Sequence, residues 1–291
     1  MSLKSRINFN AIVFRGSVKY ILSENILSSE QVCLMIIVGT IGFIGLLCGY
    51  YYLVKPYKFN SLQGLKKFVA EVKNKSSSFE KKRSTYKDLT AIITSKTVVF
   101  PGDPIFRTEP VTSMEDGSPF NLCQIHMGNH TGTHIDFPAH VLKDGKVSND
   151  YPIERLISDG LIIETPDTAS VINKTFIDKQ DILESDFVFF KTSNSDIPKQ
   201  GPFRNKYVYI EPEAAQSLIQ KKVRAVGIDY ISVDAYEAED LPVHKMFLAN
   251  DILIVENLEL KGIEAGRCKL FVMPLNVADM DGLPARVMMS R

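Results

Sequence analysis

The chain has 291 residues, enough for one large domain or two small ones. Hydrophobic residues make up 45% and charged residues 23%, a balance that excludes disorder of the whole chain. The 34 basic residues equal the 34 acidic ones. The chain therefore lacks the net positive charge that would indicate a nucleic-acid partner. The four cysteines are too few and too scattered for a disulfide framework or a zinc site of paired cysteines.

The charges divide the chain into two parts. Residues 1–84 contain 13 Lys or Arg and 4 Asp or Glu, a net charge of +9. Residues 85–291 contain the other 21 basic and 30 acidic residues, a net charge of −9. This asymmetry indicates that the two parts have different surroundings.

An uncharged apolar run of 23 residues occupies positions 32–54. It is long enough for a tilted transmembrane helix, and three tyrosines (50–52) stand where an interfacial aromatic belt would lie. The alternative is a buried helix of a soluble core, but few such helices run so far without a charge. We therefore predict an N-terminal segment (1–31), a transmembrane helix (32–54), a basic linker (55–84) and a globular domain (85–291).

The basic linker predicts the orientation of this span. It contains nine Lys or Arg, whereas residues 12–31 contain only Arg15 and Lys19. Because positive charge favours the cytoplasmic side, we expect a single-pass protein whose globular domain faces the cytoplasm. The linker either lies along anionic membrane lipid or is an ordinary solvated connection.

Short apolar runs separated by turn residues predict a strand-rich domain after residue 85. Strands are expected at 88–93, 97–100, 161–164, 187–191, 207–210, 225–228, 252–256 and 270–273. Helices are expected at 177–183 and 212–221, the second with Glu near its start and Lys at its end. The fold class is therefore α/β, a single mixed-sheet domain rich in strands with flanking helices.

Histidines and a carboxylate gather in one short stretch. Four of the five histidines, His126, His130, His134 and His140, fall within fifteen residues together with Asp136. Imidazole combined with carboxylate is the usual ligand set for zinc, manganese or iron. The alternative is that these histidines are surface residues or hydrogen-bonded core residues.

The spacing of this cluster requires a sharp turn. A straight strand would separate His130 from His134 by about 13 Å, too far for two ligands of one ion. Gly132 permits a turn at this point and also opposes a helix. A tight loop that leads into a short strand could bring His130, His134 and Asp136 to one ion, with His140 just beyond them.

Two distant residues have the same chemistry. His244 is the only histidine outside the cluster, and Glu256 lies in an otherwise apolar strand. Burying an unpaired carboxylate costs several kcal/mol, so Glu256 needs a cation or hydrogen-bond donors. A bound metal satisfies this need, and a salt bridge to a lysine is the alternative.

The string HTGTHIDFPAH (130–140) fits the HxGTHxDxPxH signature of the cyclase family of metal-dependent hydrolases, whose best known members are bacterial-type kynurenine formamidases. Residues 88–106 with their PGDP turn, 227–234 and 241–260 resemble other parts of this family. The resemblance covers about 85–291 and implies the family's swivelling β/β/α type of fold. It also implies a homodimer or homotetramer.

Carried over residue by residue, the resemblance implies a site for two divalent ions, zinc or alternatively manganese. His130, His134 and Asp136 would hold the first ion, His244 the second, and Asp136 and Glu256 would contact both. His140 would donate and accept protons, which suits a side chain that titrates near neutral pH. Ion-bound water, whose pKa falls to about 7, would supply hydroxide to attack an amide carbonyl.

The resemblance also implies a small-molecule substrate, an N-formyl aromatic amine such as N-formylkynurenine, cleaved to kynurenine and formate. Family members commonly place Trp before the PGD turn, and here that residue is Phe100, whose ring can still stack on a substrate. This difference leaves room for another cyclic amide or lactam such as isatin. Phe137 is the second candidate for substrate binding, although its ring either faces the pocket or packs the loop.

Other polar residues keep two interpretations. His126 lies outside the implied ligand set and is structural or supports the site indirectly. Asp229 and Asp234 support the site through hydrogen bonds or simply end a strand. A glycan on the sequon Asn129-His130-Thr131 would crowd the ligand loop.

A non-catalytic, membrane-tethered domain with structural metals is the remaining functional alternative, although a carboxylate-rich ligand set is typical of open sites.

Overall fold

The computed structural model describes residues 11–14, 17–20 and 86–291. The predicted transmembrane helix (32–54) and basic linker (55–84) lie outside these residues, as does most of the segment 1–31. Within the described ranges, no helix combines the length and the apolar character that a bilayer crossing needs. The chain divides into two units, Met1–Phe79 and Glu80–Arg291. The described part of the first is an antiparallel hairpin of β1 (Ala11–Phe14) and β2 (Ser17–Tyr20).

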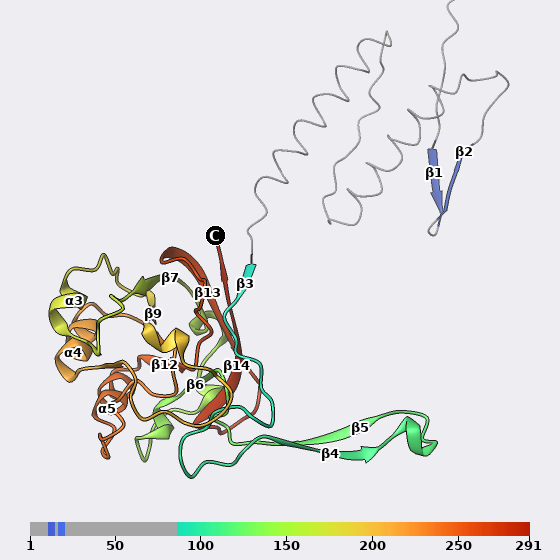
Figure 1. Ribbon diagram of the computed structural model, residues 1–291. Helices are drawn as coiled ribbons and strands as arrows, with labels where there is room; N and C mark the ends of the chain where they lie inside the picture. The colour runs from blue at the N-terminus through green and yellow to red at the C-terminus, as the bar shows by residue number, and fades with distance from the viewer. Residues whose placement is uncertain (1–10, 15–16, 21–85) are drawn as a thin grey trace, which may run out of the picture. The chain divides into compact units, whose positions relative to one another are not determined.

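The second unit is built on an eight-stranded sheet (Figure 1). Its strands are β3 (Tyr86–Asp88), β6 (His134–Asp136), β7 (Ile157–Glu164), β9 (Phe187–Lys191), β11 (Ala225–Ile228), β12 (Leu253–Glu256), β13 (Gly266–Pro274) and β14 (Gly282–Ser290). The order is β13-β7-β9-β11-β12-β6-β14-β3, with β7, β9, β11 and β12 parallel. Because β13 also pairs with β14, the sheet closes into a barrel.

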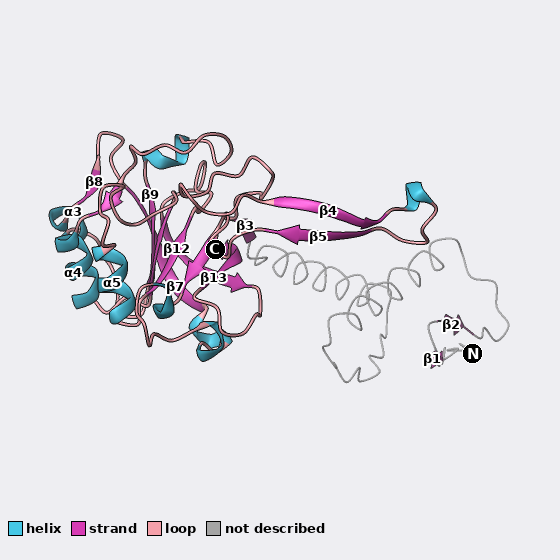
Figure 2. Cartoon of the chain, turned by 90° about the horizontal axis from the view of Figure 1, so that it is seen from below, coloured by secondary structure: helices cyan, strands magenta, loops and turns pink. Residues whose placement is uncertain are grey.

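Three helices, α3 (Lys174–Asp178), α4 (Pro212–Gln220) and α5 (Pro242–Ala249), lie together on one side of the barrel (Figures 1 and 2). Side chains of β9 alternate between two hydrophobic cores, as expected for a strand buried on both faces. Val188 and Phe190 belong to the core shared with the helices, whereas Phe187 and Phe189 belong to the core inside the barrel. The sheet is therefore covered on its helical side and filled on the other.

Two smaller pairs of strands lie outside the barrel. β8 (Val171–Ile172) pairs in parallel with β10 (Tyr209–Ile210). β4 (Arg107–Thr112) and β5 (Leu122–His126) form an antiparallel hairpin that projects away from the body (Figure 2). The chain runs from the end of this hairpin into the histidine-rich segment, so the hairpin leads into the candidate site.

The strand-rich mixed α/β fold predicted from the sequence is confirmed, with corrections to individual elements. The predicted strand 97–100 is wrong, since only an isolated bridge between Thr97 and Gln200 forms there. The predicted strand 88–93 overlaps β3 at Asp88 alone and otherwise forms only an isolated bridge between Thr90 and Leu258, and 207–210 is reduced to the two residues of β10. The shorter helix spans 174–178 rather than 177–183, and it begins there because the Asn173 side chain caps it by accepting the N–H of Phe176. β4, β5, β14 and α5 were not predicted as elements, whereas β6 is the short strand expected after the turn at Gly132.

Candidate metal centre

The centre is built on β6, which lies between β12 and β14 in the middle of the sheet. In this register His134 stands opposite Glu256 on one side, and Asp136 stands opposite Gly282 on the other. Ile135, between the two ligands, is buried in the barrel core. Because side chains alternate along a strand, His134 and Asp136 point to the opposite face, where α5 lies. The sheet thus places three predicted ligands on one surface.

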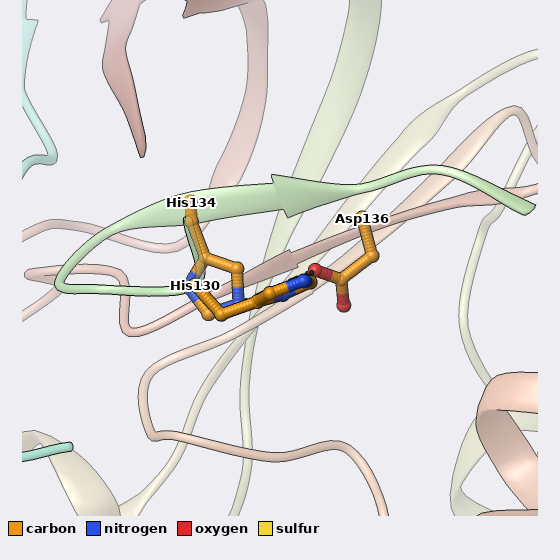
Figure 3. Close-up of side chains that lie close together, drawn as sticks. All are labelled: His130, His134 and Asp136. Carbon is orange, nitrogen blue, oxygen red and sulfur yellow. Dashed lines mark hydrogen bonds and ion pairs between the residues drawn. The ribbon is translucent and has the colours of Figure 1, made fainter. Parts of the chain in front are cut away.

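The loop before β6 brings His130 back over this surface. Gly132 has a φ of +71°, and a Cβ at this position would lie 2.7 Å from the side chain of Ile93. The chain therefore turns sharply where the sequence predicted a turn. Figure 3 shows the rings of His130 and His134 converging on the carboxylate of Asp136. Nδ1 of His130 lies 2.8 Å and Nε2 of His134 lies 3.3 Å from the same oxygen, Oδ1 of Asp136.

Helix α5 and strand β12 bring the two distant residues to the same place. Nε2 of His244 lies 3.2 Å from Oε1 of Glu256 and 3.6 Å from Oδ2 of Asp136. The second oxygen of Glu256 lies 3.5 Å from Nε2 of His134. All five predicted ligands therefore lie close together, although His244 and Glu256 are more than a hundred positions from the cluster.

His140 stands at the edge of this group. A short 3-10 turn, Pro138–His140, follows β6 and directs its imidazole back toward the ligands. The ring centroids of His140 and His130 are 4.1 Å apart, and those of His140 and His244 are 5.7 Å apart. The His140 side chain is 25% exposed, whereas that of His244 is 4% exposed. Among these histidines, His140 is thus the more accessible to a substrate.

The buried charges of the centre fit a divalent cation. Asp136 and Glu256 are 0% and 3% exposed, and two buried carboxylates this close require compensating positive charge. Oδ2 of Asp136 is buried and has no hydrogen-bond donor within the described residues. Over the same residues Glu256 contacts His134, His244 and the N–H of Val233 rather than a lysine. A metal ion would satisfy both carboxylates at once.

Each ligand imidazole is held through its other nitrogen. Nδ1 of His134 lies 2.9 Å from the carbonyl oxygen of Gly132, and Nδ1 of His244 lies 2.6 Å from Asp234. Nε2 of His130 lies 3.1 Å from Asp281. Hydrogen bonds of this kind fix the tautomer and the orientation of metal-binding histidines. They leave Nε2 of His134 and His244, and Nδ1 of His130, directed toward the carboxylates.

The electrostatic field of the centre attracts positive charge. Burial opposes protonation of His134, but Asp136 and Glu256 outweigh it and raise its pKa to about 10. Burial likewise opposes protonation of His244, yet the charge of Glu256 and the adjacent carboxylates of Asp136 and Asp234 raise its pKa. Burial acts to raise the pKa of Glu256, while the neighbouring His244 and His134 bring it below its usual value. A cation that enters this centre must therefore displace protons.

The two aspartates left open by the sequence differ in their contacts. Asp234, 1% exposed, accepts hydrogen bonds from the backbone N–H groups of Val243 and His244 as well as from the His244 ring. It therefore supports the centre directly. Asp229 instead accepts from Thr192 and Ser195, and so fixes the loop that follows β9.

Asp281 was missed by the sequence analysis. It immediately precedes β14, and its Oδ2 lies 3.1 Å from Nε2 of His130 and 3.2 Å from Nδ1 of His140. The side-chain amide of Asn129 donates to its other oxygen over 2.7 Å. The only available signal was an Asp-Gly pair, which is typical of ordinary turns.

The expectation that Phe137 faces the substrate is not met. Phe137 is fully buried and packs against Tyr151 in the barrel core, with ring centroids 5.2 Å apart. It follows Asp136 by one residue, so alternation along the chain directs it away from the ligand face. Its ring therefore packs the core, which was the other interpretation of this residue.

Phe100 lies in an aromatic cluster. Its ring is half-buried and contacts Phe203 and Tyr236, with centroids 5.6 and 6.1 Å away. Tyr236 is 39% exposed. It follows Asp234 by two residues, so the aromatic cluster lies next in the chain to the carboxylate that holds the His244 ring. His126 lies on β5, where its Nε2 is 3.4 Å from Glu109, and it contacts none of the ligands.

A closed strand-rich sheet that carries a buried carboxylate–histidine cluster defines a metal-binding α/β protein. Residues 87–235 match the model of the family described as "Putative cyclase", and the chain belongs to this family. It is 30% identical over 203 residues to "Kynurenine formamidase" of Salinibacter ruber, and the match covers 69% of this chain and 95% of the relative.

Solved structures agree with this assignment. "The Structure Of Potential Metal-Dependent Hydrolase With Cyclase Activity" is 31% identical with a TM-score of 0.63, covering 71% of this chain and 98% of the other. An isatin hydrolase bound to thioisatinate has a TM-score of 0.66, covering 77% and 98%, but is only 18% identical. The second comparison therefore shows the fold alone.

Proposed function

We propose that the protein is a metal-dependent amide hydrolase of the arylformamidase type, which cleaves N-formylkynurenine to kynurenine and formate. The observation that carries this proposal is the meeting of six side chains, the five predicted ligands and His140, from three separate segments of the chain: 130–140, α5 and β12. The kynurenine formamidase from Salinibacter ruber supports the choice of substrate.

The centre has enough ligands for two divalent ions, for which we propose zinc, with manganese as the alternative. The ligand atoms of His130, His134 and Asp136 all lie within 4.8 Å of one another, as do those of Asp136, His140 and His244. His130, His134 and Asp136 would hold one ion, His244 would hold the second, and the carboxylates of Asp136 and Glu256 would be available to both. Such ions lower the pKa of a water to about 7 and polarise a carbonyl group.

His140 is the proposed general acid and base. Its Nδ1 is directed at Asp281, which leaves Nε2 to take a proton and return it to the leaving amine. Unlike His134 and His244, which are buried, it is partly accessible to solvent. Cleavage of a formamide needs such a proton at the nitrogen, because an amine anion is a poor leaving group.

The aromatic cluster supports an aromatic substrate. Phe100 contacts Phe203 and Tyr236, whose centroids are 5.3 Å apart, so three rings pack together next to the loop of Asp234. We propose that Phe100 is the member that stacks on the ring of the substrate. An aliphatic formamide would not gain from this stacking.

Metal analysis and a substrate panel test the proposal. The full-length protein is assayed with N-formylkynurenine, with an aliphatic formamide and with isatin. We expect bound metal and cleavage of the first substrate, and hydrolysis of isatin alone would contradict the substrate assignment. His140→Ala is expected to keep the metal while kcat falls about 10²–10⁴-fold. His126→Ala is the matched control and should behave as wild type.

From the sequence alone we also propose that residues 32–54 anchor the protein in a membrane, with the hydrolase unit on the cytoplasmic side. The support is the uncharged run and the nine basic residues that follow it.

A further inference from the structure

One carboxylate oxygen is shared by two histidines that have different tasks in the proposed function. Oδ2 of Asp281 lies 3.2 Å from Nδ1 of His140 and 3.1 Å from Nε2 of His130. An ionised carboxylate only accepts hydrogen bonds, so both ring nitrogens carry the protons that they donate to it.

Asp281 is itself held on two sides. Nδ2 of Asn129 donates to Oδ1 of Asp281 over 2.7 Å and to the carbonyl oxygen of Gly282 over 3.2 Å. The backbone carbonyl of Asp281 accepts the N–H of Phe137 over 2.8 Å. Asp281 thus bonds to the residues on either side of the segment 130–136, which carries three of the candidate ligands: Asn129 before it and Phe137 after it.

The backbone next to Asp281 also fits closely against a ligand. A Cβ on Gly282 would lie 2.3 Å from Cε1 of His130, a distance that no real side chain tolerates. The His130 ring therefore rests directly on the glycine, with Asp281 at its Nε2. Its rotation is restricted by contact as well as by hydrogen bonding.

We infer that Asp281 is a positioning residue of the proposed hydrolase, and that Asn129 holds its carboxylate in place. The inference rests on the proposed function in that His140 is the acid and base. Asp281 keeps the proton of His140 on Nδ1, so that Nε2 presents its lone pair to the reacting groups. By the same oxygen it keeps the proton of His130 on Nε2 and leaves Nδ1 as the ligand atom.

The competing role for Asp281 is that of a metal ligand, since its carboxylate can converge with His130 and His140. The two roles differ in what is lost on substitution. A ligand that is removed takes bound metal with it. A positioning residue that is removed weakens metal affinity only through the imidazole that it orients, so the site still fills when metal is in excess, while the step that its partner performs is slowed.

Asp281→Asn in the full-length protein tests the inference. The amide has the same size, but its single oxygen cannot accept from Asn129 and from both histidines. We expect full metal content when metal is in excess, an unchanged KM and a kcat lower by about 10–100-fold. In a His140→Ala background the same substitution should change kcat little, because its effect passes through His140. Loss of metal, or equal losses of kcat in both backgrounds, would overturn the inference.

A second measurement does not need a substrate. Nitrogen chemical shifts of the imidazole rings report which nitrogen carries the proton, and His140 is expected to be protonated on Nδ1 in wild type and mixed in Asp281→Asn. An unchanged tautomer would overturn the inference even if kcat fell. If the wild type cleaves nothing in the panel, the proposed function fails while this measurement still decides the positioning role.

Two further variants complete the design. Asp279→Asn alters an exposed aspartate of the same turn and should match wild type in every readout. Asn129→Ala keeps the Asp281 charge but removes one hydrogen bond to it, so kcat should fall only about 2–10-fold. If Asp281→Asn does not fold, Asn129→Ala still tests the inference, and an unchanged kcat with an unchanged His140 tautomer would contradict it.

Discussion

The strongest structural test concerns Asp234, which stabilises both helix α5 and the imidazole of His244. Helix α5 begins at Pro242, and the preceding residue, Leu241, has left-handed backbone and gives no side-chain cap. Asp234 replaces that cap from the loop that leads into the helix, accepting the N–H of Val243 at 2.9 Å and that of His244 at 3.0 Å. Its negative charge at the helix N-terminus is also favourable.

In Asp234→Ala two buried backbone N–H groups lose their acceptor. Leaving each unsatisfied costs about 1–3 kcal/mol, so the free energy of unfolding should fall by about 2–6 kcal/mol. The His244 ring also loses its 2.6 Å hydrogen bond. Loss of such a partner weakens metal binding about 10–100-fold, or about 1.4–2.7 kcal/mol.

Urea unfolding of the metal-stripped protein measures the first effect, and competition with a chelator measures the second. Asp240→Ala is the matched control, since Asp240 precedes the same helix but its side chain is 88% exposed and pairs with Lys245. If Asp234→Ala and Asp240→Ala unfold at the same urea concentration and bind metal equally well, the reasoning about this carboxylate is refuted.

Three other predictions follow from the structure and the sequence. Gly282→Ala should displace His130 and lower the bound metal per chain, whereas Gly128→Ala, whose new Cβ would lie no closer than 3.5 Å to its neighbours, should not; equal metal contents would refute the close fit. Because its carboxylate neighbours raise the pKa of His134 to about 10, metal must displace protons there, so affinity measured from pH 9 to pH 6 should fall toward acid. Affinity independent of pH would contradict this. The run 32–54 predicts that full-length protein stays with membranes in alkaline carbonate, and release into the soluble fraction would contradict a membrane span.

The ligands could be predicted because their chemistry shows in the sequence. His130, His134 and Asp136 are close neighbours in the chain, and imidazole with carboxylate at that spacing is unusual outside metal sites. Glu256 was recognisable as a charged residue within an apolar strand. The turn at Gly132 followed from geometry alone, since a straight strand would hold the histidines apart.

The residues that support the ligands could not be predicted in the same way. Asp281 lies 151 positions from His130, and an aspartate before a glycine is common in turns. Phe137 kept two interpretations, because an aromatic ring inside the signature can line a pocket or pack the loop. Its burial follows from the alternation of β6, and that strand is only three residues long, too short to show a period of two.

The strand that pairs with most neighbours was also missed. β14 contains Pro284 and Arg286 among its apolar residues, so its run is interrupted. Its pairing with β6, β13 and β3 is a tertiary property that no local pattern encodes. The apolar strands β7, β9, β11 and β12 were recognisable because strands covered on both faces are nearly continuous hydrophobic runs.

Closure of the barrel by β14 has a consequence for how the enzyme matures. The pairing of β6 with β14 joins segments about 150 positions apart, and such distant pairings form late in folding. Asp281 and Gly282, which hold the His130 ring, lie at the start of β14. In a nascent polypeptide His130 is therefore not held in place until that strand pairs with β6. Metal loading should therefore follow folding, and supplying the ion during refolding should raise the yield of active protein without speeding the appearance of the native sheet.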